Sequence, residues 1–279
     1  MYSIEHKNVV ISISTADKRR NHIIAQFGQK QIPFEFFDAF TPSDRLDAHL
    51  QRYLPNVKAT SKLTAGEKGC LVSHFMLWKK CVEDNLDYIS IFEDDILLGE
   101  NAEQFLANDE WLKVRFNFQE IFVLRLETFL MPVQLEKQQQ ILPFQERNID
   151  ILKSKHFGTA GYIISNGAAK YLINLFEKLA IEEVKAIDEI MFNEQINVGA
   201  YQVYQLNPAI CVQELQLNQE NSLLVSDLQQ ERKKNTAVHT KKTLKQRLTR
   251  IKENIIRALN KEKWKEQQHL KEMQGKEIV

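Results

Sequence analysis

The chain has 279 residues, of which 43% are hydrophobic and 27% are charged, and its formal net charge is zero. This length and composition predict a globular protein with one large core, or with a core and a small appendage. The three cysteines, Cys70, Cys81 and Cys211, show no spacing typical of a disulfide framework or a zinc site, which fits a reducing compartment.

The N-terminal residues, MYSIEHKNVVISIS, carry no basic leader and no small-residue cleavage site, so we expect no signal peptide. No uncharged stretch of the chain approaches the roughly 20 apolar residues that a membrane-spanning helix needs. We therefore expect a soluble or peripheral protein.

The first part of the chain predicts alternating strands and helices. Residues 9–14 are mostly β-branched and apolar, which favours a buried strand, and a helix with Asp17 as its cap follows. The expected inner face of this helix holds Ile23, Ile24 and Phe27. Pro33 then opens a second strand, and residues 43–53 form a short helix within a long loop.

The central part begins with a well-marked helix. Thr64 and Glu67 have the spacing of a capping box, and the apolar side of the helix that follows carries Leu71, Phe75 and Trp78. Two strands come next, over 87–92 and 120–127, and each ends in charged residues. Because ligands of open α/β sheets collect beyond the carboxyl ends of strands, these two endings are candidate site positions.

Residues 131–155 show few periodic signals and predict a surface excursion. The elements expected after it are a strand over 156–165, a turn at Asn166 and Gly167, a helix with Ala168, Leu172, Leu175 and Leu179 inward, a helix over 184–196, and a strand over 201–213 interrupted at Pro208. The alternation of strands and helices predicts an α/β fold with one domain over residues 1–225.

The last segment, residues 226–279, has a different composition. From Arg232 onward it carries 15 Lys/Arg against 5 Asp/Glu, while the preceding residues carry 22 against 32. An amphipathic helix is expected here, with an apolar stripe of Leu244, Leu248, Ile251, Ile255 and Leu259. This helix could pack on the body or a partner, or lie on anionic lipid; nucleic acid is disfavoured because only Trp264 is available to stack.

Three consecutive carboxylates, Glu93, Asp94 and Asp95, stand between two apolar segments in ISIFEDDILL. Such a cluster can be a solvated edge that discourages pairing between sheets. Its apolar flanks instead place it within the fold, where fixed carboxylates favour a cation. Carboxylate oxygens suit Mg²⁺ or Mn²⁺, and such an ion can neutralise the charge that develops on a departing nucleoside diphosphate.

Six further segments, in order, carry a resemblance to a known family. They are LTAGEKGCLVSHFMLW (63–78), IFEDDILL (91–98), VLRLET (123–128), GTAGYIIS (158–165), AIDEIMF (186–192) and NPAICVQ (207–213). Together with VVISISTADKRR and FEFFDAF, they resemble glycosyltransferase family 25 over about residues 5–225. That family includes bacterial lipooligosaccharide galactosyltransferases and collagen galactosyltransferases.

The resemblance implies a single-domain GT-A-like fold, with a mixed, mostly parallel central sheet flanked by helices. It also implies a UDP-sugar donor, first of all UDP-galactose, a divalent ion such as Mn²⁺ or Mg²⁺, and inverting transfer onto a sugar hydroxyl. On this mapping the acidic triplet is a variant of the GT-A metal motif. Asp95 is the first metal ligand with Asp94 beside it, and Glu93 reaches the ribose or supports the turn.

An inverting transfer needs one positioned carboxylate as the base. Asp188 is the first candidate because it lies in a matched motif among apolar neighbours, although it could equally be an exposed helix acid. Glu127, at the end of a predicted strand, is the second candidate, and Glu189 is the third.

Arg125 lies in an apolar strand, where an uncompensated charge would be costly. It either pairs with a carboxylate such as Glu93 or Glu127, or faces a substrate anion. His74 is either a satisfied core histidine or, as the resemblance implies, part of the donor site. Thr159 and Tyr162, in the GTAGY segment, are candidate donor or acceptor contacts, and His239 is a possible late metal ligand.

The expected partners are a UDP-sugar, a lipid-anchored oligosaccharide acceptor, and anionic lipid at the inner face of a bacterial inner membrane. Two rival functions use the same features. One is a metal-dependent nucleotidyl or phosphoryl transferase, disfavoured because the chain has no GxxxxGK[ST] loop. The other is a non-enzymatic membrane adaptor that acts through the basic tail.

Overall fold

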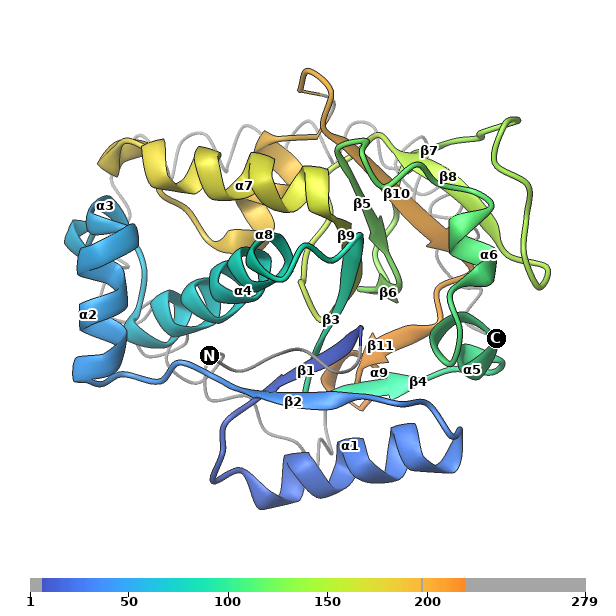
Figure 1. The fold of residues 1–279 in the computed structure, drawn as a ribbon, viewed down its shortest axis with the longest axis horizontal. Helices are drawn as coiled ribbons and strands as arrows, with labels where there is room; N and C mark the ends of the chain where they lie inside the picture. Colours follow the sequence, from blue (N-terminus) through green and yellow to red (C-terminus); the bar gives the residue numbers. More distant parts are fainter. Residues whose placement is uncertain (1–6, 197, 219–279) are drawn as a thin grey trace, which may run out of the picture.

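A large mixed sheet forms the centre of the protein, and the computed structural model describes residues 7–196 and 198–218 (Figure 1). The strand order is β2-β1-β3-β9-β5-β10-β8-β7. The strands are β1 (Asn8–Ser12), β2 (Glu35–Asp38), β3 (Tyr88–Glu93), β5 (Phe122–Arg125), β7 (Leu135–Glu136), β8 (Asn148–Leu152), β9 (Gly161–Ser165) and β10 (Gln202–Asn207). Within the described ranges only β8 and β9 run against the direction shared by the other six strands.

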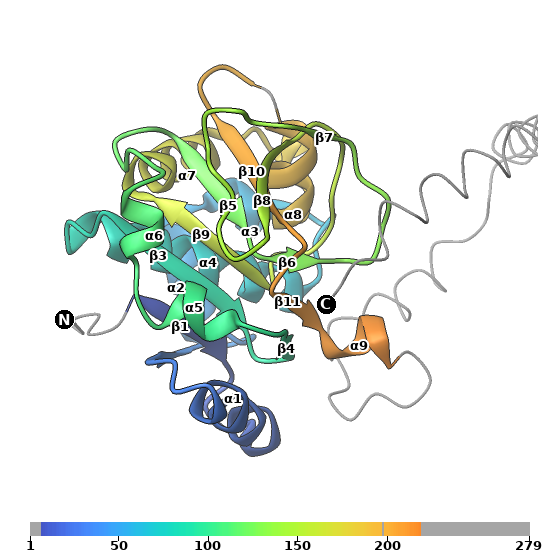
Figure 2. The same cartoon turned by 90° about the vertical axis from the view of Figure 1, so that its right-hand side faces the viewer.

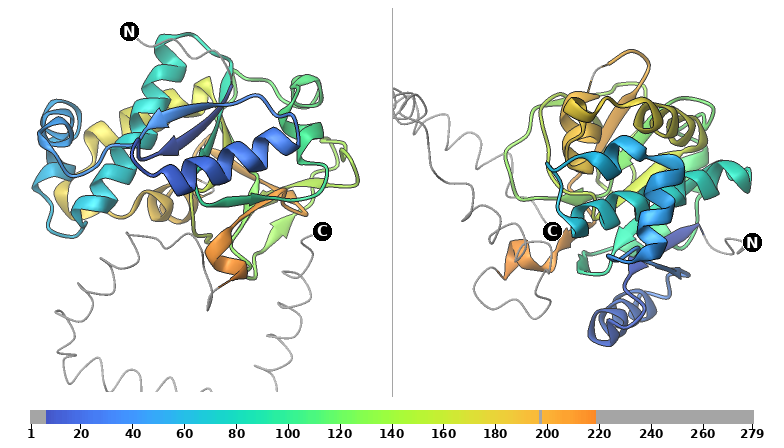
Figure 3. Two further views of the ribbon diagram at one scale, coloured as in Figure 1. Left: turned by 90° about the horizontal axis from the view of Figure 1, so that it is seen from below. Right: turned by 90° about the vertical axis from the view of Figure 1, so that its left-hand side faces the viewer.

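Helices cover both faces of this sheet. The helical segments are α1 (Asp17–Gln29), α2 (Asp44–Tyr53), α3 (Pro55–Ala59), α4 (Ala65–Glu83), α5 (Ala102–Leu106), α6 (Glu110–Lys113), α7 (Asn166–Lys178), a 3₁₀ turn (Ile181–Glu183), α8 (Ile187–Glu189) with a π turn (Ile190–Glu194), and α9 (Glu214–Leu217). Helices α4 and α7 pack together on one face, and α1 lies across β1 and β2 on the other (Figures 1 and 3).

The strands alternate their side chains between two cores, as the period of two requires. In β3, Ile89 and Ile91 join the core under α4 and α7, whereas Tyr88 and Phe92 join the core under α1, α5 and α6. Because both faces are covered, the strand reads as a continuous apolar run. The predicted α/β class, with a mixed sheet flanked by helices, is confirmed.

The start of α4 is fixed by the predicted capping box. The Thr64 hydroxyl accepts a hydrogen bond from the Glu67 amide at 3.1 Å, and the Glu67 carboxylate accepts one from the Thr64 amide at 2.8 Å. One turn further, a Cβ at Gly69 would lie 2.3 Å from the Phe40 carbonyl oxygen, so only glycine lets this helix approach the chain after β2 so closely.

A small second sheet closes the carboxyl end of the large one. Its order is β4 (Ile96–Leu98), β11 (Cys211–Gln213) and β6 (Glu127–Thr128), and Figure 2 shows β11 between the other two, with α9 at its outer end. β4 directly follows the acidic triplet and β6 directly follows β5, so this sheet holds both strand endings in place.

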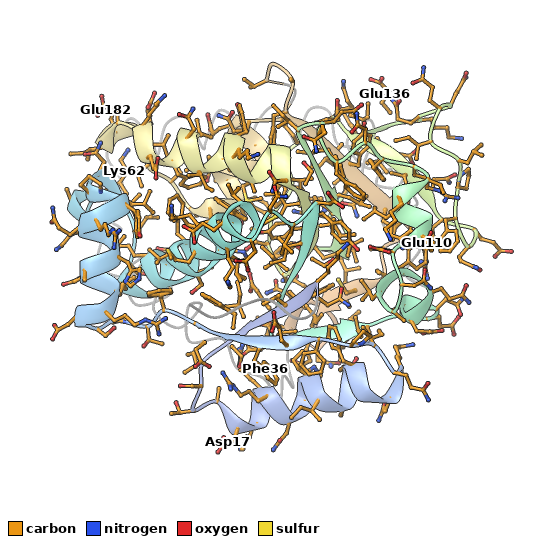
Figure 4. All side chains as sticks on the ribbon, in the orientation of Figure 1. Asp17, Phe36, Lys62, Glu110, Glu136 and Glu182 are labelled. Carbon is orange, nitrogen blue, oxygen red and sulfur yellow. The ribbon has the colours of Figure 1, made fainter. Side chains whose placement is uncertain are left out.

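Long-range contacts also join the ends of the helical layer. Lys62, after α3, donates a hydrogen bond to the Glu182 carbonyl, and Figure 4 shows both labelled side chains at the same end of the molecule. Nearby, the Asn56 side chain donates to the Leu179 carbonyl at 2.8 Å. These bonds tie the end of α7 to the α2–α3 corner.

Several local expectations were wrong. Asp17 is the first residue of α1 and gives no side-chain cap, and Ile24 is 52% exposed because it lies on the outer side of the helix. Asn166 and Gly167 form no turn; they start α7, which Ser165 caps by accepting a hydrogen bond from the Ala168 amide.

Residues 131–155 are only partly a surface excursion. They contain β7 and β8, and β8 pairs with β10 inside the large sheet. The strand expected over 201–213 is two strands, β10 and β11, which belong to different sheets. Among the described residues, no helix is both long and apolar enough to cross a membrane.

Candidate active site

The acidic triplet lies at the carboxyl end of β3, beside the end of β1. Glu93 is the last residue of β3, and Asp94 and Asp95 form the two-residue turn into β4. Asp94 is 6% exposed and Asp95 is 5% exposed. The Ser12 hydroxyl, at the end of β1, donates a hydrogen bond of 2.7 Å to an Asp94 oxygen. The cluster is therefore part of the packed fold and not a solvated edge.

Arg19, on the first turn of α1, partly neutralises the cluster, and sequence reasoning missed it. Its guanidinium donates to Asp94 and lies 3.6 Å from an Asp95 oxygen. Burial by itself would lower the pKa of Arg19, but Asp94 and Asp95 hold it above its usual value. The available signal was the DKRR run directly after the first strand, because β1 lies beside β3 and so brings its following helix to the triplet.

The remaining charge of the cluster favours a further cation. Three carboxylates face one guanidinium, which leaves two formal negative charges when all three are ionised. Burial and the neighbouring Glu93 raise the pKa of the Asp95 carboxyl to about 7, so its anionic form is disfavoured without added positive charge. A divalent ion with a preference for oxygen ligands fits this donor set.

Glu93 and Asp95 are joined by residues from elsewhere in the sequence. The Gln213 side-chain amide, from β11, lies 3.4 Å from one Glu93 oxygen and 3.3 Å from an Asp95 oxygen. The Thr159 hydroxyl donates a 2.8 Å hydrogen bond to the other Glu93 oxygen. Burial acts to raise the pKa of Glu93, but its contacts with His74, Thr159 and Arg19 hold it below the usual value. Glu93 is thus an anion fixed from two sides.

Arg125 pairs with Glu127 in the interior of the protein. Its side chain is fully buried and donates to Glu127 at 3.1 Å, to the Phe157 carbonyl at 2.8 Å and to the Gly158 carbonyl at 2.9 Å. The guanidinium also lies over the Phe192 ring, 4.1 Å from its centroid. Of the two predicted alternatives, pairing with a carboxylate is the one observed.

Glu127 lies beneath the 157–160 segment and is fully buried. One carboxyl oxygen accepts from Arg125 and from the Ala160 amide, the latter at 2.9 Å. A Cβ at Gly158, whose φ is +82°, would lie 3.0 Å from the other oxygen, so glycine is needed there both for its conformation and for space. Burial raises the pKa of the Glu127 carboxyl to about 8, against the opposite effect of Arg125.

Asp188 lies on the other side of the same segment and is half-buried. One of its oxygens accepts a hydrogen bond from the Gly158 amide at 3.1 Å, and the other accepts from the Glu189 amide at 3.0 Å. Glu189 itself faces Lys155 at 3.6 Å. Asp188 and Glu127 both bond to the 157–160 segment, but only Asp188 is reachable from solvent.

His74 and Tyr162 lie in the interior below the triplet, 0% and 1% exposed. The His74 Nδ1 atom is 2.8 Å from the Tyr162 hydroxyl, and its Nε2 atom is 3.7 Å from a Glu93 oxygen. The sulfur, nitrogen and oxygen atoms that Cys70, His74 and Glu93 could offer to a metal ion lie within 4.8 Å of one another. Among the described residues, this is the one cluster of His, Cys, Asp or Glu with such spacing. The predicted late ligand His239 lies outside the described residues.

Replacing Arg19 by methionine is expected to lower the free energy of unfolding by about 1.5–3 kcal/mol, the range for hydrogen bonds between charged groups. The physical reason is that Asp94 and Asp95 would stay buried together without their cation. Urea denaturation of the full chain measures this loss. Lys18→Met is the matched control, since it removes the same charge from an exposed position on the same helix. Equal destabilisation by both variants would contradict the assignment.

Comparison with known proteins gives a consistent result. Residues 5–191 match the family described as "Glycosyltransferase family 25 (LPS biosynthesis protein)". The lipooligosaccharide biosynthesis protein lex-1 of Haemophilus influenzae is 55% identical, covering 98% of each chain. The lacto-N-neotetraose biosynthesis glycosyltransferase LgtE of Neisseria gonorrhoeae is 43% identical, and the match covers 81% of each chain. The lacto-N-neotetraose biosynthesis glycosyltransferase LgtB of the same organism is 40% identical, and the match covers 98% of this chain and 99% of LgtB.

Among solved structures, a glycosyltransferase involved in glycosylation of the major capsid of PBCV-1 aligns with a TM-score of 0.37 and 8% identity, over 74% of this chain and 91% of that one. That likeness is too distant to add to the argument. The sequence matches, and the acidic turn at the carboxyl end of β3, agree with the GT-A-like fold that the resemblance implied. On this evidence, the chain belongs to glycosyltransferase family 25.

Proposed function

We propose that this glycosyltransferase moves galactose from UDP-galactose onto a sugar hydroxyl of a growing lipooligosaccharide, with inversion and with a divalent ion. The observation that carries the proposal is the buried acidic triplet at the carboxyl end of β3, joined through Thr159 to the segment that Asp188 holds. The relatives' descriptions as lipooligosaccharide and lacto-N-neotetraose biosynthesis proteins support the acceptor class.

Asp95, with Asp94 beside it, would hold the divalent ion, because carboxylate oxygens suit such an ion and the cluster keeps an excess of negative charge. When bound, such an ion supplies positive charge to the diphosphate of the donor. Glu93 is then available for a ribose hydroxyl or for the ion, because one of its oxygens faces only the weakly placed Gln213 amide. Ser12 and Arg19 fix Asp94 from the β1 side, so the ligand side of the cluster is the side toward β11 and Thr159.

The reaction is a single displacement. The acceptor hydroxyl oxygen forms a bond to the anomeric carbon while the bond from that carbon to the UDP oxygen breaks, and UDP leaves with the electron pair. The acceptor hydroxyl loses its proton, which we assign to Asp188. Asp188 is held by the Gly158 amide and remains partly exposed, so an entering hydroxyl can reach it. Glu127 instead supports the segment from below through Ala160.

Asp188→Asn is expected to lower kcat by about 10²–10⁴-fold, the usual contribution of a positioned base, while the affinity for UDP stays unchanged. The amide oxygen can still accept from Gly158, so the segment keeps its place. Steady-state kinetics and calorimetric UDP titration measure the two effects. Glu194→Gln, which removes an exposed carboxylate of the following π turn, is the matched control. A kcat for Asp188→Asn close to the native value would rule out Asp188 as the base.

The function itself is tested with a donor panel of UDP-galactose, UDP-glucose and their N-acetyl forms, using a truncated lipooligosaccharide as acceptor. We expect a mass increase of one hexose with UDP-galactose, loss of transfer after chelation, and recovery with Mn²⁺. Asp95→Asn should require far more Mn²⁺ for the same rate. NMR of the product's anomeric proton determines inversion.

Transfer that persists after chelation would refute the metal requirement, and a retained anomeric configuration would refute the single displacement. Release of galactose 1-phosphate with transfer of UMP to the acceptor would favour the rival nucleotidyl transferase, and release of UMP with transfer of galactose phosphate would favour the rival phosphoryl transferase. Transfer of a different sugar from the panel would correct the donor and leave the reaction class intact.

The C-terminal segment, which lies outside the described residues, is the proposed membrane contact. Its excess of Lys and Arg would attach the enzyme to anionic lipid on the cytoplasmic face of a bacterial inner membrane, where each such residue contributes about 1 kcal/mol. That surface would also carry the lipid-anchored acceptor. The proposed membrane location of the enzyme therefore agrees with the proposed lipid-anchored acceptor.

Deleting residues 241–279 is expected to abolish sedimentation with vesicles that contain anionic phosphatidylglycerol. The deletion removes 12 of the 15 Lys and Arg residues that the chain carries from Arg232 onward. Turnover of a soluble acceptor should be unchanged, which controls for folding. Neutral phosphatidylcholine vesicles should bind neither protein. Undiminished binding by the shortened chain would refute the tail as the membrane contact.

A further inference from the structure

Three buried side chains, Trp78, Tyr162 and His74, form a polar path that leads to Glu93. The Trp78 indole N–H donates to the Tyr162 hydroxyl at 3.0 Å, and that hydroxyl lies 2.8 Å from His74 Nδ1. His74 Nε2 in turn lies 3.7 Å from the Glu93 oxygen that Thr159 also contacts. Trp78, His74 and Tyr162 are at most 1% exposed, so their contacts with one another lie away from bulk solvent.

The donors and acceptors along this path fix where the protons lie. An indole N–H can only donate, so the Tyr162 hydroxyl must accept from Trp78. Burial raises the pKa of Tyr162 well above its usual value, so the hydroxyl keeps its proton. That proton has His74 Nδ1 as its acceptor. A neutral imidazole that accepts at Nδ1 carries its own proton at Nε2.

We infer that Trp78 and Tyr162 hold His74 in the Nε2–H tautomer, and that His74 and Thr159 together fix one oxygen of Glu93 so that its other oxygen faces the donor. His74 and Tyr162 are thus positioning residues, not donor contacts. This inference rests on the proposed function, because it takes Glu93 to be part of the donor site.

The state of His74 Nε2 agrees with such a role. It is buried and has no hydrogen-bond partner among the described residues. Its 3.7 Å distance to Glu93 is longer than a hydrogen bond. Hydrogen bonds in ligand-free sites are often long and tighten when the substrate binds. The Glu93 side chain is 22% exposed, so a ligand can reach it from the solvent side.

A metal ion among Cys70, His74 and Glu93 is the competing arrangement. Their sulfur, nitrogen and oxygen ligands would suit zinc. However, His74 would then need a free electron pair at Nε2 and a proton at Nδ1. The Tyr162 hydroxyl would accept two hydrogen bonds, and the contacts described for residues 7–196 and 198–218 would leave its own proton without an acceptor. The proton positions therefore favour the Nε2–H tautomer of His74 over a metal ion bound at Nε2.

The first test is the tautomer of His74 in the full chain, read from two-bond ¹H–¹⁵N spectra of protein with ¹⁵N-labelled histidine. His74→Gln assigns the signal among the seven histidines. We expect an Nε2–H imidazole in the native protein, and a shift toward Nδ1–H in Tyr162→Phe, which lacks the donor. A native Nδ1–H tautomer would overturn the inference, and so would Zn²⁺ binding that is lost in Cys70→Ser.

The second test is UDP affinity by calorimetry at fixed Mn²⁺. Tyr162→Phe and Thr159→Val should each weaken UDP binding about 5- to 10-fold, the effect of losing one hydrogen bond, with a larger change in donor KM than in kcat. Tyr171→Phe is the matched control, since it also removes a tyrosine hydroxyl, one that bonds to Gln195 at the end of the π turn. His74→Gln, whose amide N–H can replace Nε2–H, should bind UDP more tightly than His74→Asn.

Failure of this inference can be told apart from failure of the proposed function. If the native protein binds UDP but all four variants bind it equally well, His74, Tyr162 and Thr159 do not position Glu93, and the glycosyltransferase proposal stands. If the native protein binds no UDP at any Mn²⁺ concentration, the proposed donor is wrong, and so is the proposed role of Glu93 in binding it. Should a variant not fold, the native tautomer still decides the question.

Discussion

The site depends on keeping three adjacent carboxylates together at the end of a buried strand. Their mutual repulsion is offset by a serine hydroxyl from β1 and by the Arg19 guanidinium from α1, and β1 is the parallel neighbour of β3. The order of strands therefore places a hydrogen-bond donor and a positive charge beside the carboxylates, in addition to forming the core. When all three carboxylates are ionised, the cluster keeps two formal negative charges, which suits the divalent cation proposed for this site.

A second charge pair supports the other half of the site. Arg125 and Glu127 are both fully buried, and between them they contact the Phe157 and Gly158 carbonyls and the Ala160 amide. A buried pair of this kind is weak evidence for stability, since its desolvation is costly. Its value here is geometric, because the same short segment carries Thr159 toward the triplet and receives Asp188 at Gly158.

The two halves explain how one edge of the sheet can serve donor and acceptor. β3 and β5 run in the same direction on either side of the antiparallel β9, so both end where β9 begins. The chain entering β9 is therefore the natural bridge between the triplet and the Arg125–Glu127 pair. The small sheet of β4, β11 and β6 then closes this edge and brings Gln213 to Glu93 and Asp95.

The sequence by itself determined what depends on neighbours along the chain. The capping box at Thr64, the apolar runs of β1 and β3, the acidic triplet and the ordered motifs of the family could all be predicted, because periodicity, caps and motif spacing are local. Where Ile24 was assigned to the core, or Asn166 to a turn, a local pattern had two solutions and tertiary packing selected the other.

Only the tertiary structure decided which charges meet. Arg19 and Asp94 are 75 residues apart, and nothing in their local sequence marks them as partners. The same holds for burial: Glu127 and Asp188 were both candidate bases, but Glu127, at the start of β6, is fully buried, whereas Asp188, on α8, is half-buried. The reason is that solvation and pairing depend on strand order and on helix placement, which a linear pattern does not contain.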